Sequence, residues 1–418
     1  MRFFPIRLLL CCLLLILMLA FPLAPLVKSQ TPTSVDVEQY LINGQFQQGE
    51  TALLNKLKVN PNDDRTRFGL GVVQLMGGVE SLMQSLYRYG LQQNAVTSFF
   101  PILRLPVPNN PTPQPITYKD SRSILQNLLT DLDKVKNTLE PIKDPKVKLP
   151  LRIGLTRMDL NANKKLEANE SFWKTFSLLT GRQATEKDAQ KFAIAFDAGD
   201  VVWLKGYCNL LSAIAQVVLA YDESQLFDST GHLIFAKPQT SYPFLQKGKS
   251  NFVFGETDIT DLIAFIHLIN FPVAEPQRLL TALQHMQTVT ALSRQSWKMI
   301  LAETDNDREW LPNPKQKAVI PNAAVTKPMI DGWLSFLNEA DALLTGQKLV
   351  PFWRKPELRG LNINKVFTQP RQLDLVLWVQ GTGAAAYLEN GKPTDPGVWQ
   401  RLLEVFRGQL LQFGAWFN

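Results

Sequence analysis

The chain has 418 residues, of which 45% are hydrophobic and 19% are charged, and its formal net charge is +7. This length accommodates two or three domains, and the composition is that of a globular protein rather than of a disordered chain. No run of five like charges occurs. The sequence therefore lacks the clustered Lys and Arg of a nucleic-acid interface, and we expect no nucleic-acid partner.

Residues 1–29 have the pattern of a secretory signal peptide. Arg2 and Arg7 lie at the start of an apolar stretch of roughly 20 residues, which ends at Val27-Lys28-Ser29 with modest or small residues at the −3 and −1 positions. Two prolines near the end of the stretch favour cleavage. The alternative is an uncleaved N-terminal membrane anchor, which would be the only contact with a membrane that the sequence predicts.

The cysteine content agrees with export to a bacterial compartment. Beyond the apolar segment only Cys208 remains, so the mature chain can form no internal disulfide. This usage suits a bacterial envelope protein better than a small disulfide-stapled secreted domain. We therefore expect an exported protein of the periplasm or cell envelope.

Residues 30–98 are predicted as a helical region that resembles part of a tetratricopeptide repeat (TPR). The resemblance rests on residues at the spacing of that repeat: Gly44, Phe46, Gly49, Leu53, Pro61, Leu70 and Gly71. Its small residues would let paired helices approach closely, and Pro61 would follow the second helix. Lys56 stands where a small residue is usual, so a plain antiparallel helical hairpin is the alternative. In either form the TPR-like hairpin would offer a surface to a protein partner.

Residues 99–119 are predicted as a proline-rich connector, because its many prolines exclude a helix. The remainder, 120–418, is predicted as an α-helical domain. Its expected helices are 120–140, 170–181, 197–222, 257–271, 275–303, 329–346 and 394–417.

Two further features complete the predicted fold. The segment 197–222 is the most apolar of the mature chain, but polar residues interrupt it, so we expect a buried core helix rather than a membrane span. The runs 232–237 and 251–256 are β-like and would allow one small β-hairpin. The expected fold class is mainly α, a multi-helix body with the TPR-like hairpin at its N-terminal side.

The stretch "DLNANKKLEANE", residues 159–170, has the spacing of a calcium-binding loop of the EF-hand type. Such loops carry oxygen ligands at positions 1, 3, 5, 7, 9 and 12, with a backbone carbonyl at position 7. The corresponding residues are Asp159, Asn161, Asn163, Lys165, Glu167 and Glu170. Leu166, at position 8, matches the apolar residue that anchors such loops. The sequence therefore predicts calcium as a ligand.

Lys164 argues against tight binding, since it occupies position 6, where glycine is the norm. A side chain forced to positive φ costs on the order of 1 kcal/mol. Two lysines also bring positive charge close to the site. We expect weak binding, roughly in the 10⁻⁴–10⁻³ M range, or a loop that keeps its shape without the ion.

A second acidic group, Glu303, Asp305, Asp307 and Glu309, could bind a cation or supply acid and base groups. The alternative is a solvated helix end. In "DAGD", residues 197–200, Asp200 is expected to satisfy the amides at the start of the core helix. The three histidines, His232, His267 and His285, form no metal motif, and the sequence lacks the usual nucleophile and nucleotide-binding motifs.

Five stretches together resemble a family of uncharacterised secreted bacterial proteins, including cyanobacterial ones. They are "DLNANKKLEANESFW", "DVVWLKGYCNLL", "ETDNDREWLPNP", "LNEADALLTGQKLVPFWR" and "LDLVLWVQG", and the resemblance covers most of 120–390. In those proteins the loop resembles "DLNGDGK", where this chain has Ala162, Asn163 and Lys164 in place of Gly, Asp and Gly. The resemblance implies a derived calcium loop and supplies no activity.

Two functions agree with these patterns. The first is a non-enzymatic exported envelope protein, a helical interaction or scaffold module with a weak or degenerate calcium loop. The second is an α-helical hydrolase-like enzyme that acts on a cell-envelope substrate with the acids near 303–309 and His267 or His285. A single deep pocket lined by those acids and a histidine would favour the enzyme.

Overall fold

The structure is a computed structural model that describes residues 35–98, 103, 105–167, 170–174, 185–246, 257–319, 325–354, 359–410 and 413–414. The predicted signal peptide, 1–29, the β-like run 251–256 and most of the predicted helix 170–181 lie outside the described residues. Within them the protein is mainly helical, with a few small sheets, which confirms the predicted fold class.

The described helices range from the four residues of α5 to the 27 residues of α12. The helices are α2 (Val35–Ile42), α3 (Phe46–Val59), α4 (Asp64–Arg88), α5 (Ala95–Ser98), α6 (Tyr118–Leu139), α8 (Glu186–Lys191), α9 (Ala198–Leu219), α10 (Ser224–Thr230), α11 (Thr257–His267), α12 (Pro276–Ala302), α13 (Lys327–Leu344), α14 (Ile363–Thr368), α15 (Leu375–Gln380) and α16 (Pro396–Val405). The strands are β1 (Lys148–Leu151), β2 (Ile194–Asp197), β3 (Asn270–Phe271), β4 (Val350–Pro351), β5 (Gly360–Leu361), β6 (Leu373–Asp374) and β7 (Leu388–Glu389).

The N-terminal helices form the close-packed hairpin that the glycine pattern predicts. Gly44 makes the turn between α2 and α3 with a φ of +59°. Gly49 lies against Tyr40, where an added Cβ would come within 2.7 Å of the ring carbon Cγ. The carboxylate of Asp63 caps α4 by accepting the amide of Thr66 at 2.9 Å.

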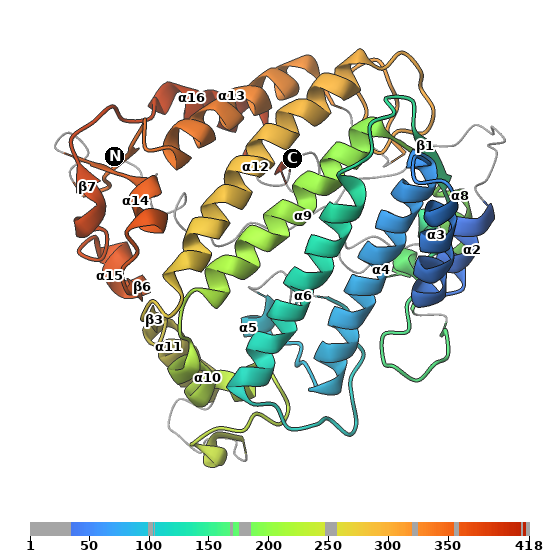
Figure 1. Cartoon of the computed structure of the whole chain (residues 1–418). Coiled ribbons are helices and arrows are strands. Elements are labelled where there is room, and N and C mark those ends of the chain that lie inside the picture. The colour runs from blue at the N-terminus through green and yellow to red at the C-terminus, as the bar shows by residue number, and fades with distance from the viewer. Residues whose placement is uncertain are drawn as a thin grey trace.

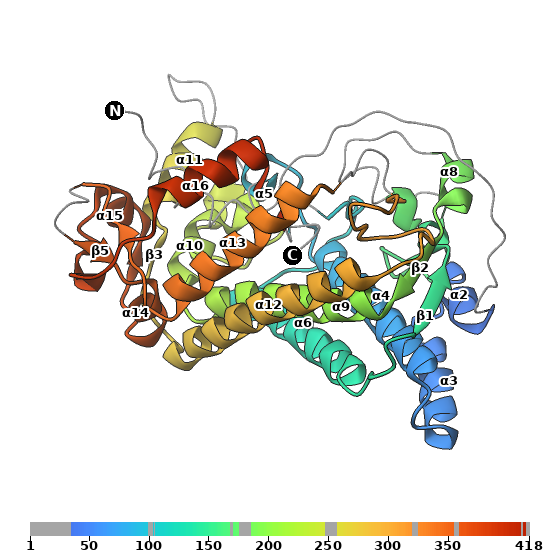
Figure 2. The same cartoon turned by 90° about the horizontal axis from the view of Figure 1, so that it is seen from above.

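Four long helices, α4, α6, α9 and α12, pack side by side in that order, as Figures 1 and 2 show. α3 extends this row on the α4 side, and α13 followed by α16 extends it on the α12 side. The amphipathic pattern of 120–140 explains the position of α6, because its apolar face is buried between α4 and α9.

One large hydrophobic cluster runs through the molecule. It includes Val37 of α2, Phe68 of α4, Trp297 of α12 and Phe413 near the C-terminus. Ile116 of the proline-rich connector is also buried in it. The core of the α2–α3 hairpin is therefore continuous with the core of the helices that follow.

α9 is the central helix of this row. Among the described residues it is the one helix whose length and composition would allow it to cross a membrane, and α6 and α12 pack on either side of it. Its buried Cys208 thiol has a pKa raised to about 12 by burial. The contacts are those of the buried core helix that the polar interruptions predict.

The small sheets connect distant parts of the chain. β1 pairs antiparallel with β2, which sets Lys148 opposite Asp197. β3 pairs with β6, and β4, β5 and β7 form a three-stranded sheet beside α14 and α15. Near this end of the molecule, Trp378 and Tyr387 belong to a second, smaller hydrophobic cluster.

The contact between Gly49 and Tyr40 predicts a loss of stability on substitution. Gly49→Ala should lower the free energy of unfolding by about 1–2 kcal/mol, because overpacking against the base of the ring outweighs the gain in helix propensity. Urea denaturation measures the change. The matched control is Gly77→Ala in α4, whose added Cβ comes no closer than 3.3 Å to Phe46. An equal effect of both substitutions would show that close helix approach at Gly49 is not the cause.

Candidate metal centres

The 159–170 loop is fixed to α4 at its first residue and is closed by a hydrogen bond between its last residue and the residue that precedes the loop. The side-chain amide of Gln84 in α4 donates to the carbonyl oxygen of Asp159 at 2.7 Å, and the carboxylate of Glu80 accepts the amide of Asp159 at 2.7 Å. At the other end, the carbonyl of Glu170 accepts the amide of Met158 at 3.0 Å. Leu166 contacts the α2–α3 turn at Gly44. The α2–α3 turn and α4 thus hold the loop.

The middle of the loop bends as the calcium-loop pattern requires. Lys164, at the position where glycine is usual, has a φ of +63°, and Ala162 has a φ of +59°. The two carboxylate oxygens of Asp159 accept the amides of Asn163 at 3.1 Å and Lys164 at 2.8 Å. The backbone is therefore wrapped around the first predicted ligand.

The remaining predicted ligands are held by backbone amides in the same way. Asn161 accepts the amide of Asn163 at 3.0 Å, and Asn163 accepts the amide of Lys165 at 2.7 Å. The fully buried Glu170 accepts the amides of Leu160 at 3.0 Å and Glu167 at 2.8 Å, one with each oxygen. Amide contacts of this kind orient the oxygens of a metal site from outside.

Negative charge accumulates at this loop. Burial, followed by the charges of Asp159 and Glu167, raises the pKa of Glu170. Burial and the charges of Asp159 and Glu170 raise the pKa of Glu80 to about 7. Among the described residues, no lysine or arginine forms an ion pair with any of these four carboxyl groups. A cation at the loop would relieve this repulsion.

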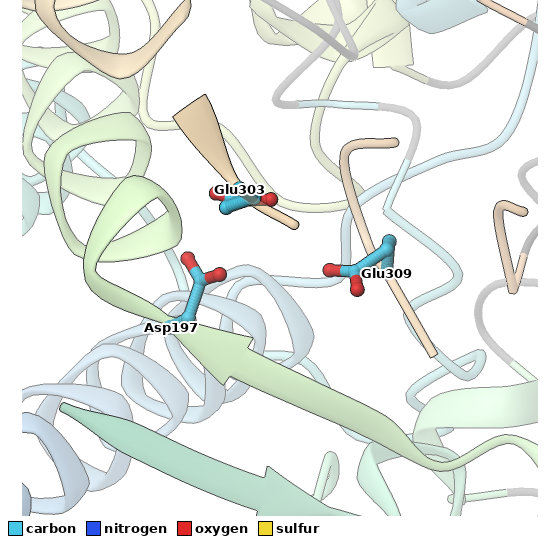
Figure 3. Close-up of side chains that lie close together, drawn as sticks. All are labelled: Asp197, Glu303 and Glu309. Carbon is cyan, nitrogen blue, oxygen red and sulfur yellow. The ribbon is translucent and has the colours of Figure 1, made fainter. Parts of the chain in front are cut away.

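A tighter acidic cluster lies elsewhere. One oxygen each of Asp197, Glu303 and Glu309 lies within 4.8 Å of the other two, and Figure 3 shows the three carboxyl groups facing one another. Asp197 ends β2, Glu303 directly follows α12, and Glu309 lies in the segment after it. Across the described residues no other acidic, cysteine or histidine side chains gather this closely, those of the 159–170 loop included. This acid triad could hold a metal ion.

Each member of the acid triad is positioned by a hydrogen bond. Asp197 is the N-cap of α9, and its carboxylate accepts the amides of Gly199 at 2.8 Å and Asp200 at 3.3 Å. The side-chain amide of Gln316 donates to Glu303 at 3.1 Å, and Glu309 accepts the amide of Asp307 at 2.7 Å. The arrangement is thus built into the start of α9 and the segment after α12.

The N-cap of α9 is Asp197 rather than Asp200, the residue that the sequence predicts to satisfy the helix-start amides, and Asp200 completes a capping box. Its carboxylate accepts the amide of Asp197 at 3.0 Å, so the two residues cap the start of α9 reciprocally. Asp200 is buried, and burial together with the charge of Asp197 raises its pKa.

The acid triad holds its protons more strongly than isolated carboxyl groups do. Burial and the charge of Asp197 raise the pKa of Glu303 to about 8. Burial and the charges of Asp197 and Asp305 raise the pKa of Glu309 to about 7, and burial raises the pKa of Asp197. Near neutral pH the triad can therefore share protons or bind a cation, since three adjacent charges repel one another.

The other two acids of 303–309 lie outside the triad. Asp305 and Asp307 are half-exposed, and both pair with Lys148 of β1, Asp307 at 3.2 Å. The hydrogen bond from Lys148 lowers the pKa of Asp305. The predicted acidic group is thus divided into an ion-pair network and two members of the triad.

The histidines lie away from these acids. His285 contacts Asn209 at 2.7 Å from the middle of α12, and the 18 residues between it and Glu303 span roughly 27 Å of helix. His232 lies 3.2 Å from Asp261, and His267 is exposed on α11. A groove of about 730 Å³ lies between α3, α4 and α6, and its lining contains none of the triad acids.

Two residues that contribute to the candidate metal sites, Glu80 at the loop and Asp197 in the triad, could not be recognised in the sequence. Glu80 was simply one acid of a helix, and Asp197 had the pattern of a cap. Only the packing of α4 on the loop and the approach of α9 to the end of α12 give these two residues their neighbours.

Comparisons with known proteins found no matching family model, no matching curated protein and no matching solved structure. The resemblance to secreted bacterial proteins therefore remains a prediction.

The raised pKa values predict how stability depends on pH in chelator-containing buffer. In the folded protein the pKa values of Glu309 and Glu303, about 7 and about 8, lie above the value of about 4.5 expected in the unfolded chain. Their contribution to stability is therefore complete below about pH 4.5 and is lost as the pH rises through about 7 and 8. Glu303→Gln should reduce this loss between pH 5 and 8 by on the order of 1 kcal/mol, because solvent screens the partly exposed site. Urea denaturation at several pH values measures it.

Asp188→Asn in α8 is the matched control for this experiment. Hydrogen bonds with Thr185 lower the pKa of Asp188, so its contribution is lost only at acidic pH, and the decline between pH 5 and 8 should persist. The proton-sharing triad would be contradicted if the stability of the wild type fell no more between pH 5 and 8 than that of Glu303→Gln.

Proposed function

We propose that the protein is a non-enzymatic, exported helical protein of the cell envelope whose 159–170 loop binds calcium weakly. The main support for the proposal is the environment of the Glu170 carboxyl group. This carboxyl group is fully buried, both of its oxygens accept loop amides, and burial together with the charges of neighbouring acids raises its pKa. A buried carboxyl group in this position is stabilised in its charged form by a cation.

The chemistry of the loop favours calcium over other ions. Its donors are carboxylate, amide and carbonyl oxygens, which suit a hard cation, and neither histidine nor cysteine is among them. Lys164 has the positive φ that a calcium loop requires at this position. The strain of that conformation and the nearby lysine charges support weak rather than tight binding.

The role that this supports for calcium is structural. Glu80 and Gln84 belong to α4 and contact the first residue of the loop. An ion would neutralise the repulsion among Glu80, Asp159 and Glu170 and so strengthen the contact between α4 and the loop. The TPR-like hairpin packs on α4, and its surface is the proposed contact for a protein partner.

The acid triad supports a second candidate function, the α-helical hydrolase-like enzyme. Glu303 has a raised pKa and would be available as a general acid near neutral pH. Two observations favour the non-enzymatic proposal. The described histidines lie apart from the triad, and the groove between α3, α4 and α6 does not include it.

Calcium should stabilise the wild-type protein through Glu170. With a dissociation constant of roughly 10⁻⁴–10⁻³ M, calcium at about 10 mM should add about 1–3 kcal/mol to the free energy of unfolding. Urea denaturation and the Tm, measured with calcium and with chelator, report the shift. Glu170→Gln should abolish it, and Glu303→Gln should retain it. A shift that survives Glu170→Gln and disappears in Glu303→Gln would assign the ion to the triad instead.

Replacing Lys164 should tighten calcium binding. Lys164→Gly removes about 1 kcal/mol of backbone strain, which corresponds to roughly fivefold tighter binding if the ion selects this conformation. Lys164→Ala is the matched control, because it removes the charge and keeps a side chain at positive φ. In calorimetric titration the calcium affinity of Lys164→Gly should therefore be higher than that of Lys164→Ala, and both should be higher than that of the wild type. Unchanged affinity in Lys164→Gly would contradict the role given to this position.

A further inference from the structure

Six of the thirteen large hydrophobic side chains that are exposed among the described residues lie on two short helices, α11 and α15. On α11, Ile259, Ile263 and Ile266 are 54%, 61% and 44% exposed. Their spacing of four and three residues places them on one face of the helix. On α15, Val376, Leu377 and Val379 are 47%, 46% and 39% exposed.

These two groups adjoin one another. α11 packs against α15, and the amide of Leu375, the first residue of α15, donates to the carbonyl of Ile269 at 2.9 Å. The pairing of β3 with β6 brings the end of α11 to the start of α15. Figure 1 shows the two helices at the same end of the molecule. The six side chains, here called the α11–α15 patch, expose several hundred Å² of apolar surface, an area that commonly marks a functional contact.

An amphipathic aromatic ring and a cation border the patch. The indole N–H of Trp353 donates to the carbonyl of Val379 at 3.2 Å, and Arg354 donates to the carbonyl of Gln380 at 2.7 Å. Both side chains are therefore fixed at the C-terminal end of α15. Arg354 is exposed, and no acidic residue among the described ones forms an ion pair with it.

We propose that the α11–α15 patch docks the protein onto a bilayer that contains anionic phospholipid. The aliphatic side chains would enter the boundary between headgroups and acyl chains, which is where a tryptophan is also most stable. Arg354 would lie at the level of the headgroups and pair with their phosphates. The combination of apolar side chains, an indole and a cation that pairs with no acid in the described part of the chain matches the chemistry of such an interface.

A second copy of the chain fits this surface less well. Stable interfaces bury about 800 Å² on each partner, more than the patch offers. A two-fold contact centred on the patch would also bring the Arg354 side chains of both copies close together. The bilayer satisfies both the apolar face and the cation, Arg354, at its edge.

Docking through this face would orient the molecule. In both Figure 1 and Figure 2, α3 lies at the opposite end from α11 and α15. The TPR-like hairpin would then face away from the membrane, where its surface is open to a soluble partner.

Vesicle co-sedimentation tests the proposal. The full-length gene is expressed, and the protein is used in the form that the host releases, so that every variant carries the same N-terminus. Vesicles are phosphatidylcholine alone or equal parts of phosphatidylcholine and phosphatidylglycerol, in chelator-containing buffer so that calcium cannot bridge lipid and protein. The wild type should bind the mixed vesicles more strongly. Ile259→Ser with Ile263→Ser should weaken this binding by about tenfold or more, because two apolar contacts are lost.

Two further variants test the contribution of the cation and the location of the binding surface. Arg354→Gln should weaken binding to the mixed vesicles and leave binding to phosphatidylcholine unchanged. Val59→Ser in α3, a residue that is 88% exposed at the other end, should bind as the wild type does. Equal Tm values for all variants verify that each is folded.

Several outcomes would overturn the proposal. They are no binding of the wild type to mixed vesicles, equal binding to both vesicle types, and binding by the double variant that equals that of the wild type. Self-association of the wild type in solution, abolished by the double variant and without vesicle binding, would assign the patch to a second copy.

Discussion

The packing of α9 against α12 is the contact on which the rest of the molecule depends. The two helices run in opposite directions, so the start of α9 meets the end of α12, where the hydroxyl of Ser296 donates to the carbonyl of Gly199 at 3.2 Å. This approach brings Asp197 to Glu303 and creates the acid triad. It also fixes β2, and through it β1 and the segment that leads into the 159–170 loop.

Both acidic sites illustrate the same physical constraint. A helix row of this kind buries apolar faces between its members, and carboxyl groups at the row's ends are partly removed from water. At the triad, three such groups are adjacent and retain protons. At the loop, backbone amides hold the carboxylates of Asp159 and Glu170 in place, so the charge there is ordered before any ion arrives. The loop is therefore the better prepared cation site, although the triad is more compact.

Much of the fold could be predicted from local patterns, and much of the site could not. Helical periodicity gave α6, α9 and α12, and the glycine spacing gave the tight hairpin, because these depend on neighbours within a few residues. The spacing of 159–170 gave the loop and its bend at Lys164. The contacts of Glu80 with Asp159 and of Asp197 with Glu303 join residues far apart in the chain, so only tertiary packing could reveal them.

The most direct test of the central claim is a crystal structure determined with calcium. The account predicts an ion at 2.3–2.6 Å from oxygens of Asp159, Asn161, Asn163, Lys165 and Glu170, with Glu167 contacting it directly or through water. Lys164 should keep its positive φ. Calcium bound at Asp197, Glu303 and Glu309 with none at the loop, or a loop whose oxygens turn outward to solvent, would contradict it.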